Sequence, residues 1–155
     1  MQVKINKIGR IVLGCTLLWY GVLRGAKALV VMLKGWQLVN VNIADMTATM
    51  LLRFVIKNPL VIGIKLKGII GDVYVHGQKI GTIEHYYDYY LSGMKAHVIP
   101  VETTIYGDVL GVTMLQNLQA SIANDVEFAF VGKILVGDYG LSIPVRIERN
   151  WGDIS

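Results

Sequence analysis

Disulfide bonds within the chain are excluded, because its 155 residues contain a single cysteine, Cys15. The disulfide framework that stabilises many small secreted domains is therefore missing. Charged residues are also few, at 17%, against 54% hydrophobic residues and a mean hydropathy of +0.50. This composition is too apolar for an intrinsically disordered chain. It indicates either a rich core or apolar surface that meets a membrane or a protein partner.

Acidic residues are lacking from the first 34 positions. That segment carries only basic charges, at Lys4, Lys7, Arg10, Arg24, Lys27 and Lys34. The rest of the chain holds nine basic residues and all eleven acids, a net charge of −2. A basic segment on a mildly acidic domain predicts contact with anionic lipid or an acidic protein partner. Nucleic acid is not an expected partner, because the domain has no basic run and no nucleic-acid-binding motif.

The longest apolar run near the N-terminus is Ile11–Leu23. As a helix it would span roughly 20 Å, which is less than the ~30 Å hydrocarbon core of a bilayer. Continued to residue 34, the helix would place its polar and basic residues on one stripe, with Trp19 on the other side. We expect the following residues to contact a membrane or a partner: Arg10, Trp19, Tyr20, Arg24, Lys27 and Lys34.

Three interpretations of this N-terminal helix stay open. In the first, the helix is membrane-bound, either lying in the interface or spanning the bilayer with its basic residues reaching the headgroups. Alternatively it docks on another protein in a large assembly, or it is a cleaved signal peptide. Three basic residues precede Ile11–Leu23 and three follow it within the first 34 positions, so the side of a membrane is not indicated.

Alternation of apolar and polar residues begins at Trp36 and predicts strands with one buried face. Asn58-Pro59, His76–Lys79 and Gly137–Gly140 are predicted turns. Spacings of three and four predict a short helix over Val109–Ala123. We therefore predict a mainly β protein, an antiparallel β-sandwich of about seven strands with one short helix, preceded by the N-terminal apolar and amphipathic helix. The expected domains are residues 1–35 and 36–155, with a hinge at Lys34–Trp36.

Three stretches of the chain carry a resemblance to a known family. They are Arg53–Pro59, which ends in Asn58-Pro59, then Gly71–Gly81, then Val98–Thr104. In this pattern the chain resembles the late embryogenesis abundant β-sandwich family, also called the water-stress and hypersensitive-response (WHy) domain, over roughly residues 37–149. The resemblance implies a non-catalytic domain linked to stress tolerance or binding, often behind an N-terminal membrane helix. It brings no catalytic residues. On physical grounds Asn58 and Pro59 form a structural turn.

The most unusual local feature is a tyrosine cluster at Tyr86, Tyr87, Tyr89 and Tyr90. Tyrosine gives large contact area at low entropic cost, so the cluster is a candidate interface; the alternative is tyrosines that cover a sheet edge. His76, His85 and His97 have no metal-ligand spacing. No catalytic residue, metal site or cofactor is expected.

Two functional hypotheses follow. The first is a non-catalytic binding or protective module that its N-terminal helix attaches to a membrane of unknown side. The second is a structural subunit of a larger assembly, for example a virion component, in which the helix and the tyrosine cluster are protein contacts and oligomers form.

Overall fold

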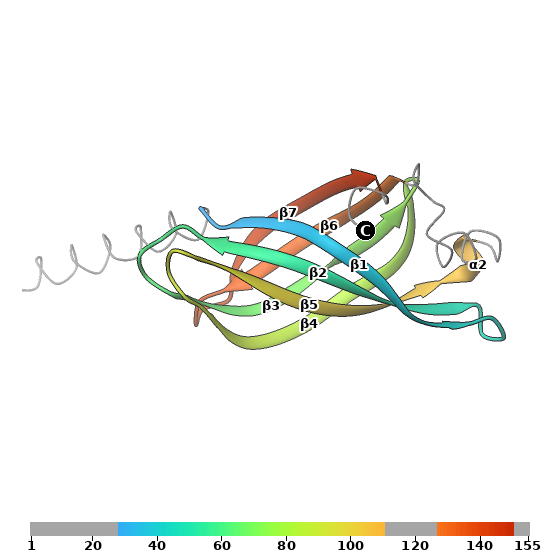
Figure 1. The fold of residues 1–155 in the computed structure, drawn as a ribbon, viewed down its shortest axis with the longest axis horizontal. Helices are drawn as coiled ribbons and strands as arrows, with labels where there is room; N and C mark the ends of the chain where they lie inside the picture. The colour runs from blue at the N-terminus through green and yellow to red at the C-terminus, as the bar shows by residue number, and fades with distance from the viewer. Residues whose placement is uncertain (1–27, 111–126, 151–155) are drawn as a thin grey trace, which may run out of the picture.

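The computed structural model describes residues 28–110 and 127–150 of the chain. Seven strands follow one another with one short helix between the fifth and the sixth (Figure 1). Their bounds are β1 Val30–Asn42, β2 Thr47–Asn58, β3 Ile64–Val75, β4 Gln78–Leu91, β5 Lys95–Tyr106, α2 Gly107–Leu110, β6 Glu127–Val136 and β7 Leu141–Asn150. The mainly β character and the seven antiparallel strands predicted from the sequence are confirmed.

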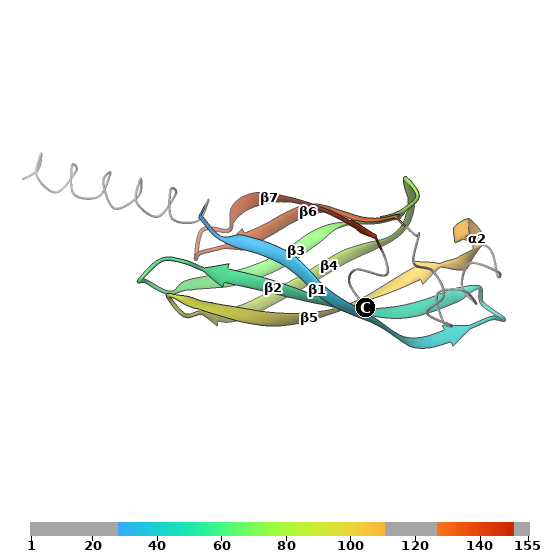
Figure 2. The same cartoon turned by 45° about the horizontal axis from the view of Figure 1, so that its top comes forward.

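The strands form one curled sheet in the order β1-β2-β5-β4-β3-β6-β7, and not the two separate sheets of the predicted sandwich. The half made of β1, β2 and β5 lies as a layer against the half made of β3, β4, β6 and β7 (Figure 2). Backbone pairing between the halves is limited to one residue pair, Gly81 with Ile105. Alternation along each strand reveals which face is buried, but it cannot reveal this one long-range pair.

The first strand begins earlier than the sequence predicted. Residues Val30–Asn42 form β1, so the helix expected to run to Lys34 and the hinge at Lys34–Trp36 are wrong for residues 30–36. Leu29 and Leu33 are buried in the core. Residues four apart share a face in both a helix and a strand, so these leucines fitted either pattern. Most of the helix predicted over Val109–Ala123 lies outside the described residues; α2 overlaps its first two positions.

The core lies between the two halves of the sheet. Each half contributes inward-facing apolar side chains, and the largest include Phe54 of β2 and Phe128 and Phe130 of β6. The rings of Phe54 and Phe130 meet edge to face with centroids 5.1 Å apart. Burial of one such side chain stabilises a fold by about 1.5–3 kcal/mol, so this contact is a main link between the halves.

A glycine pair lets the strands approach closely beneath Phe130. Gly71 of β3 is paired with Gly132 of β6. A Cβ atom on Gly132 would lie 2.2 Å from the carbonyl oxygen of Ile70, and a Cβ atom on Gly71 would lie 2.6 Å from the Phe130 ring. The aromatic ring thus occupies the space that two side chains would otherwise fill.

The predicted turn between β3 and β4 is confirmed as a two-residue hairpin loop. His76 and Gly77 both have positive φ, 47° and 76°. This is the requirement of a type I′ turn, whose twist matches that of the flanking strands.

Candidate interaction surfaces

The tyrosine cluster lies on β4, where β4 and β5 separate beyond their single backbone pair. Three side chains of β4 reach the other strand across this gap. His85 Nε2 lies 2.7 Å from the carbonyl oxygen of Glu102, the Tyr87 hydroxyl donates to the carbonyl of Pro100 at 3.3 Å, and the Tyr89 hydroxyl lies 3.3 Å from His97 Nδ1. We call His85, Tyr87 and Tyr89 the seam residues.

The seam residues take the positions at which β4 would continue its core-facing pattern after Ile83. The rings of His85 and Tyr87 stack with centroids 6.2 Å apart, and Tyr87 is partly buried, which raises the pKa of its hydroxyl. These side chains close the gap that the missing backbone ladder leaves. Part of the tyrosine cluster therefore stabilises the fold.

Tyr86 and Tyr90 have a different environment. Their exposed fractions are 65% and 58%. The hydroxyl of Tyr86 donates to Glu84 at 3.0 Å, and this hydrogen bond raises the pKa of Tyr86. The ring of Tyr90 lies over Gly63, where a Cβ atom would collide with it. These two tyrosines are the members of the cluster with the most surface to offer a partner.

The Asn58-Pro59 turn is organised by a fully buried amide. Asn58 Oδ1 accepts the N–H of Leu60 at 3.1 Å. Asn58 Nδ2 donates to the carbonyls of Ile62 and Leu91, at 2.9 and 3.1 Å. The side chain is therefore satisfied on both its oxygen and its nitrogen, as a buried amide must be. It fixes the loop between β2 and β3 against the end of β4.

Of the residues expected to contact a membrane or partner, Arg10, Trp19, Tyr20, Arg24 and Lys27 lie outside the described residues. Lys34 lies on β1 and is exposed. It borders a shallow, mainly apolar groove of about 540 Å³ that Met32, Val55, Ala96 and Val98 also line. Met32, Val55 and Val98 stand opposite one another across β1, β2 and β5 and share the outer face of that half.

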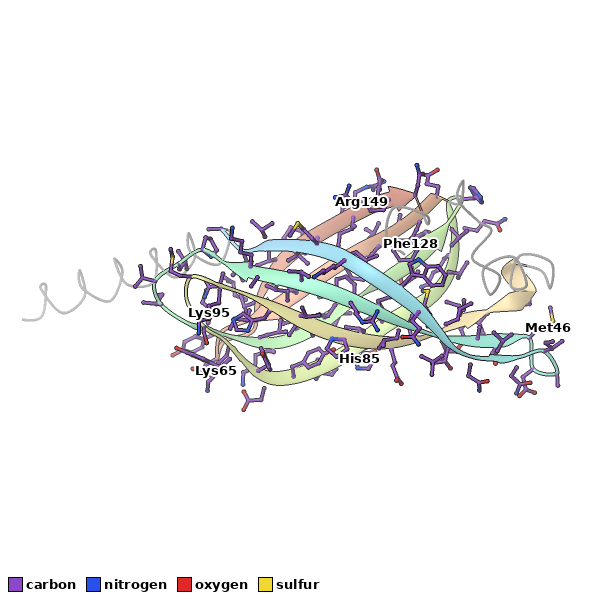
Figure 3. All side chains as sticks on the ribbon, viewed as in Figure 1. Met46, Lys65, His85, Lys95, Phe128 and Arg149 are labelled. Atoms are coloured by element: carbon purple, nitrogen blue, oxygen red, sulfur yellow. The ribbon has the colours of Figure 1, made fainter. Side chains whose placement is uncertain are left out.

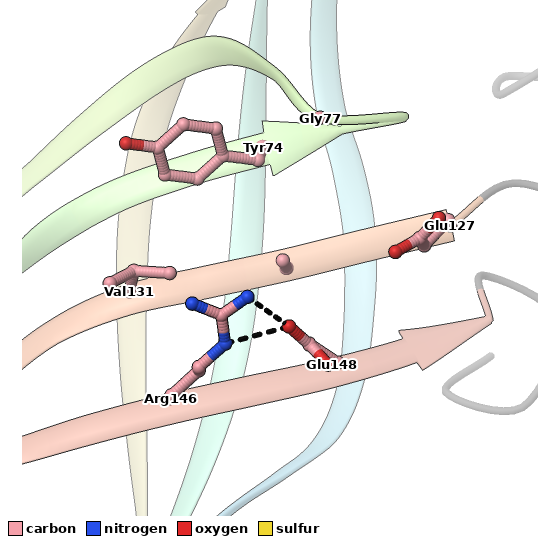
Figure 4. Close-up of a pocket in the computed structure, with 7 residues that line it drawn as sticks. Tyr74, Gly77, Glu127, Val131, Arg146 and Glu148 are labelled. Carbon is pink, nitrogen blue, oxygen red and sulfur yellow. Dashed lines mark hydrogen bonds and ion pairs between the residues drawn. The ribbon is translucent and has the colours of Figure 1, made fainter.

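A second shallow groove, of about 310 Å³, lies on β3, β6 and β7 (Figure 4). Tyr74, Val131, Arg146 and Glu148 are among the residues that line it. Arg146 Nε donates to Glu148 Oε1 at 2.7 Å. Arg146 and Glu148 therefore already satisfy each other at the surface, and the remaining charged side chain of this groove is the exposed acid Glu127.

Two other kinds of site are missing from residues 28–110 and 127–150. This part of the chain holds no cluster of three or more histidine, cysteine, aspartate or glutamate side chains arranged to bind a metal ion. It also contains no helix with the length and apolarity to cross a bilayer.

Comparison with known proteins places the chain by fold. No protein-family model matches it, and no curated protein does. The fold is similar to the solution structure of AT1g01470 from Arabidopsis thaliana, with a TM-score of 0.60 and 12% identity over 79% of this chain and 80% of that chain. It is also similar to the crystal structure of a protein from Archaeoglobus fulgidus, with a TM-score of 0.50 and 10% identity over 76% and 93%. Identities this low show a shared fold and leave function open.

Sequence reasoning selected the tyrosines but did not recognise His85 and His97 as their partners at the seam. The available signal was spacing: His85, Tyr87 and Tyr89 continue the two-residue period of Ile83 with polar-tipped rings. The polar ends of such rings need hydrogen-bond partners. A change from aliphatic to polar aromatic residues on the inward face of a strand therefore indicates that this part of the strand lies at the edge of the core.

Proposed function

We propose that this chain is a non-catalytic binding or protective module similar to the WHy domain family, attached to a membrane by the segment that precedes β1. The observation that carries the proposal is the abrupt change of composition at the start of the fold. Residues 1–29 hold five basic residues, no acid and the apolar run Ile11–Leu23. Among the described residues, Leu29, just before β1, is already buried in the core. Basic, apolar segments of this kind bind anionic bilayers.

The fold likeness to the Arabidopsis structure supports the WHy-like part of the proposal at the level of architecture. Asn58 of the Asn58-Pro59 turn, the most distinctive part of the sequence resemblance, is buried, and its side chain is hydrogen-bonded through both its oxygen and its nitrogen. Its role is to shape the fold. Function in such a module would therefore reside in its surfaces and in its N-terminal segment.

A second candidate function is a structural subunit of a larger assembly, such as a virion. The exposed rings of Tyr86 and Tyr90 on β4 favour it, because tyrosine is enriched in protein interfaces. Under this hypothesis the same N-terminal segment contacts a neighbouring subunit, and the protein forms oligomers through β4.

Flotation with anionic vesicles separates the two candidates. The full chain and a truncated chain beginning at Ala28 are mixed with phosphatidylcholine vesicles that contain phosphatidylglycerol, and circular dichroism checks that both are folded. Membrane attachment predicts that only the full chain floats; high salt releases an interfacial segment and leaves an inserted one bound. If neither floats and the full chain forms oligomers that Tyr86→Ser or Tyr90→Ser dissociates, the assembly hypothesis replaces membrane attachment.

A further inference from the structure

Exposed apolar side chains gather at one end of the molecule. The loops 59–63, 92–94 and 137–140 and the start of β1 all lie at this end, on the left in Figure 1. We call these three loops the loop end. Val61, Ile62 and Met94 have exposed fractions of 87%, 58% and 69%. Large aliphatic side chains on adjacent loop tips form an apolar surface rather than isolated exposures.

The backbone under these side chains is held firmly. Asn58 bonds to the carbonyl of Ile62, and the N–H of Met94 donates to the carbonyl of Leu60 at 2.8 Å. Gly93 approaches Val61 so closely that a Cβ atom on Gly93 would lie 2.1 Å from the Val61 carbonyl oxygen. The two apolar loops are therefore locked together, and the exposure of their side chains is a fixed property of the fold.

Two lysines without an ion pair flank this apolar surface. Lys57 is next to loop 59–63 and Lys95 is next to loop 92–94. Both are exposed, and neither makes an ion pair within the described residues. Figure 3 shows Lys95 at the same end as Lys65. Lys65 forms an ion pair with Asp138 at 3.3 Å. Lys67 forms one with Asp88 at 2.7 Å, which raises the pKa of Lys67 and lowers the pKa of Asp88. The unpaired charge at this end is positive.

The opposite end of the molecule has a different character. Ile43, in the turn between β1 and β2, is 61% exposed, which is close to the value of Ile62. Its neighbours include Asp45, whose carboxylate accepts a hydrogen bond from Asn42 at 2.5 Å. An apolar residue at this end thus stands beside an acid, whereas those of the loop end stand beside lysines.

We propose that the loop end is a membrane-contact surface, with Val61, Ile62 and Met94 inserted among the headgroups of an anionic bilayer and Lys57 and Lys95 against the lipid phosphates. An apolar tip flanked by two lysines matches the chemistry of that interface, where apolar groups enter about 5–10 Å and basic groups stay at the headgroups.

The position of β1 is consistent with a bilayer at the loop end. Val30, the first residue of β1, is paired with Lys57 beside the loop end, so the basic, apolar N-terminal segment joins the fold there. The inference rests on the proposed membrane attachment and adds a second, independent contact made by the folded domain itself.

An environment-sensitive fluorophore on the full chain tests insertion directly. The probe, nitrobenzoxadiazole, is attached to Val61→Cys in a Cys15→Ser background, with Ile43→Cys as the matched control at the opposite end. Both positions are exposed, so neither substitution disturbs the core. On phosphatidylcholine vesicles with phosphatidylglycerol, we expect a blue shift and a severalfold gain in emission at position 61, quenched by lipid-borne quenchers, and neither change at position 43.

A charge variant tests the headgroup contact. Lys95→Gln is expected to weaken vesicle binding about fivefold, the usual contribution of one basic residue at an anionic surface. Lys133→Gln removes the same charge from an exposed position within β6, outside the loops that carry Val61, Ile62 and Met94, and is expected to leave binding within about twofold.

The outcomes separate this inference from the proposed function. If the full chain floats but position 61 responds no more than position 43, attachment stands and the loop-end contact is wrong. If the full chain does not float, both are wrong. If the probe at position 61 is shielded before lipid is added and the protein is then dimeric, a second copy of the chain covers the loop end, and this too overturns the lipid contact.

Discussion

The side-chain amide of Asn58 donates a hydrogen bond to the backbone carbonyl of Leu91 at 3.1 Å and so joins the end of β2 to the end of β4. These strands belong to different halves of the curled sheet and are not paired with each other. One buried side chain therefore links the two halves at the loop end, at a distance from the single backbone pair of Gly81 and Ile105.

Asn58→Ala is expected to lower the free energy of unfolding by about 2–3 kcal/mol, because it leaves the buried carbonyl of Leu91 and the partly buried backbone groups of Leu60 and Ile62 without their partner. Urea denaturation measures the change. Asn40→Ala, at an exposed position of β1, should stay within about 0.5 kcal/mol of the parent. Equal effects of the two substitutions would show that the buried amide has no special role.

Tyr87→Phe is expected to cost about 1 kcal/mol of stability, since it removes the hydroxyl that bonds to Pro100 across the seam while keeping the ring. Tyr86→Phe makes the same chemical change on the adjacent, exposed residue and should alter stability by less than about 0.5 kcal/mol. Denaturation curves of the two variants, measured side by side, decide the matter. The assignment of Tyr87 to the seam fails if Tyr86→Phe is the more damaging.

Gly132→Ala is expected to destabilise the protein by about 1–3 kcal/mol, because its methyl group would collide with the backbone carbonyl of Ile70, which no rotamer change can move. Ala129→Gly, on the same strand, removes a methyl group and should cost only about 0.5–1 kcal/mol. Thermal unfolding gives both values. A Gly132→Ala variant as stable as the parent would mean that β3 and β6 are further apart than described.

The Asp72 carboxylate accepts hydrogen bonds from Lys79 and Thr82, at 2.8 and 3.0 Å, and the lysine bond is the main reason that the pKa of Asp72 lies below its usual 3.8. A lowered folded-state pKa means that the unfolded chain binds more protons in acid. The stabilisation is therefore fully present above about pH 4 and is lost as the pH falls through the folded-state pKa. Asp72→Asn should lose less stability than the parent between about pH 5 and about pH 2.5.

The cause of that shift can be checked separately. Lys79→Gln is expected to move the pKa of Asp72 upward, as followed by NMR titration of the carboxyl carbon, because the strongest donor to the carboxylate is gone. An unchanged titration would assign the shift to other groups.

Much of the fold follows from short-range patterns in the sequence. The strand alternation along β2 and β5, the His76–Gly77 loop and the turn at Gly137–Gly140 all depend on neighbours within a few residues. These signals persist in the folded chain because one face of each strand is buried. The number of sheets depends on a single pair of residues distant in sequence, so no local pattern contains it.

The loop end shows a different limit of sequence reasoning. Ile62 fits an alternating pattern with Ile64, and that pattern predicts that it faces inward, yet it is exposed in the loop before β3. A short apolar run beside proline and glycine fits a buried strand as well as it fits an apolar loop. In the folded chain, the hydrogen bonds of Asn58 fix this segment as a loop against the end of β4.

Closure of the sheet at the seam has a consequence for tolerance to mutation. A backbone ladder, such as that of β3 with β4, forms whatever the side chains are, apart from proline, because every residue brings the same N–H and C=O groups. Beyond Gly81, β4 contacts β5 through the side chains of His85 and Tyr87, so this contact depends on which residues stand at those two positions. Closure of the sheet at the seam is therefore sensitive to single amino-acid substitutions. Such a substitution can open the sheet while the backbone ladders within each half stay intact.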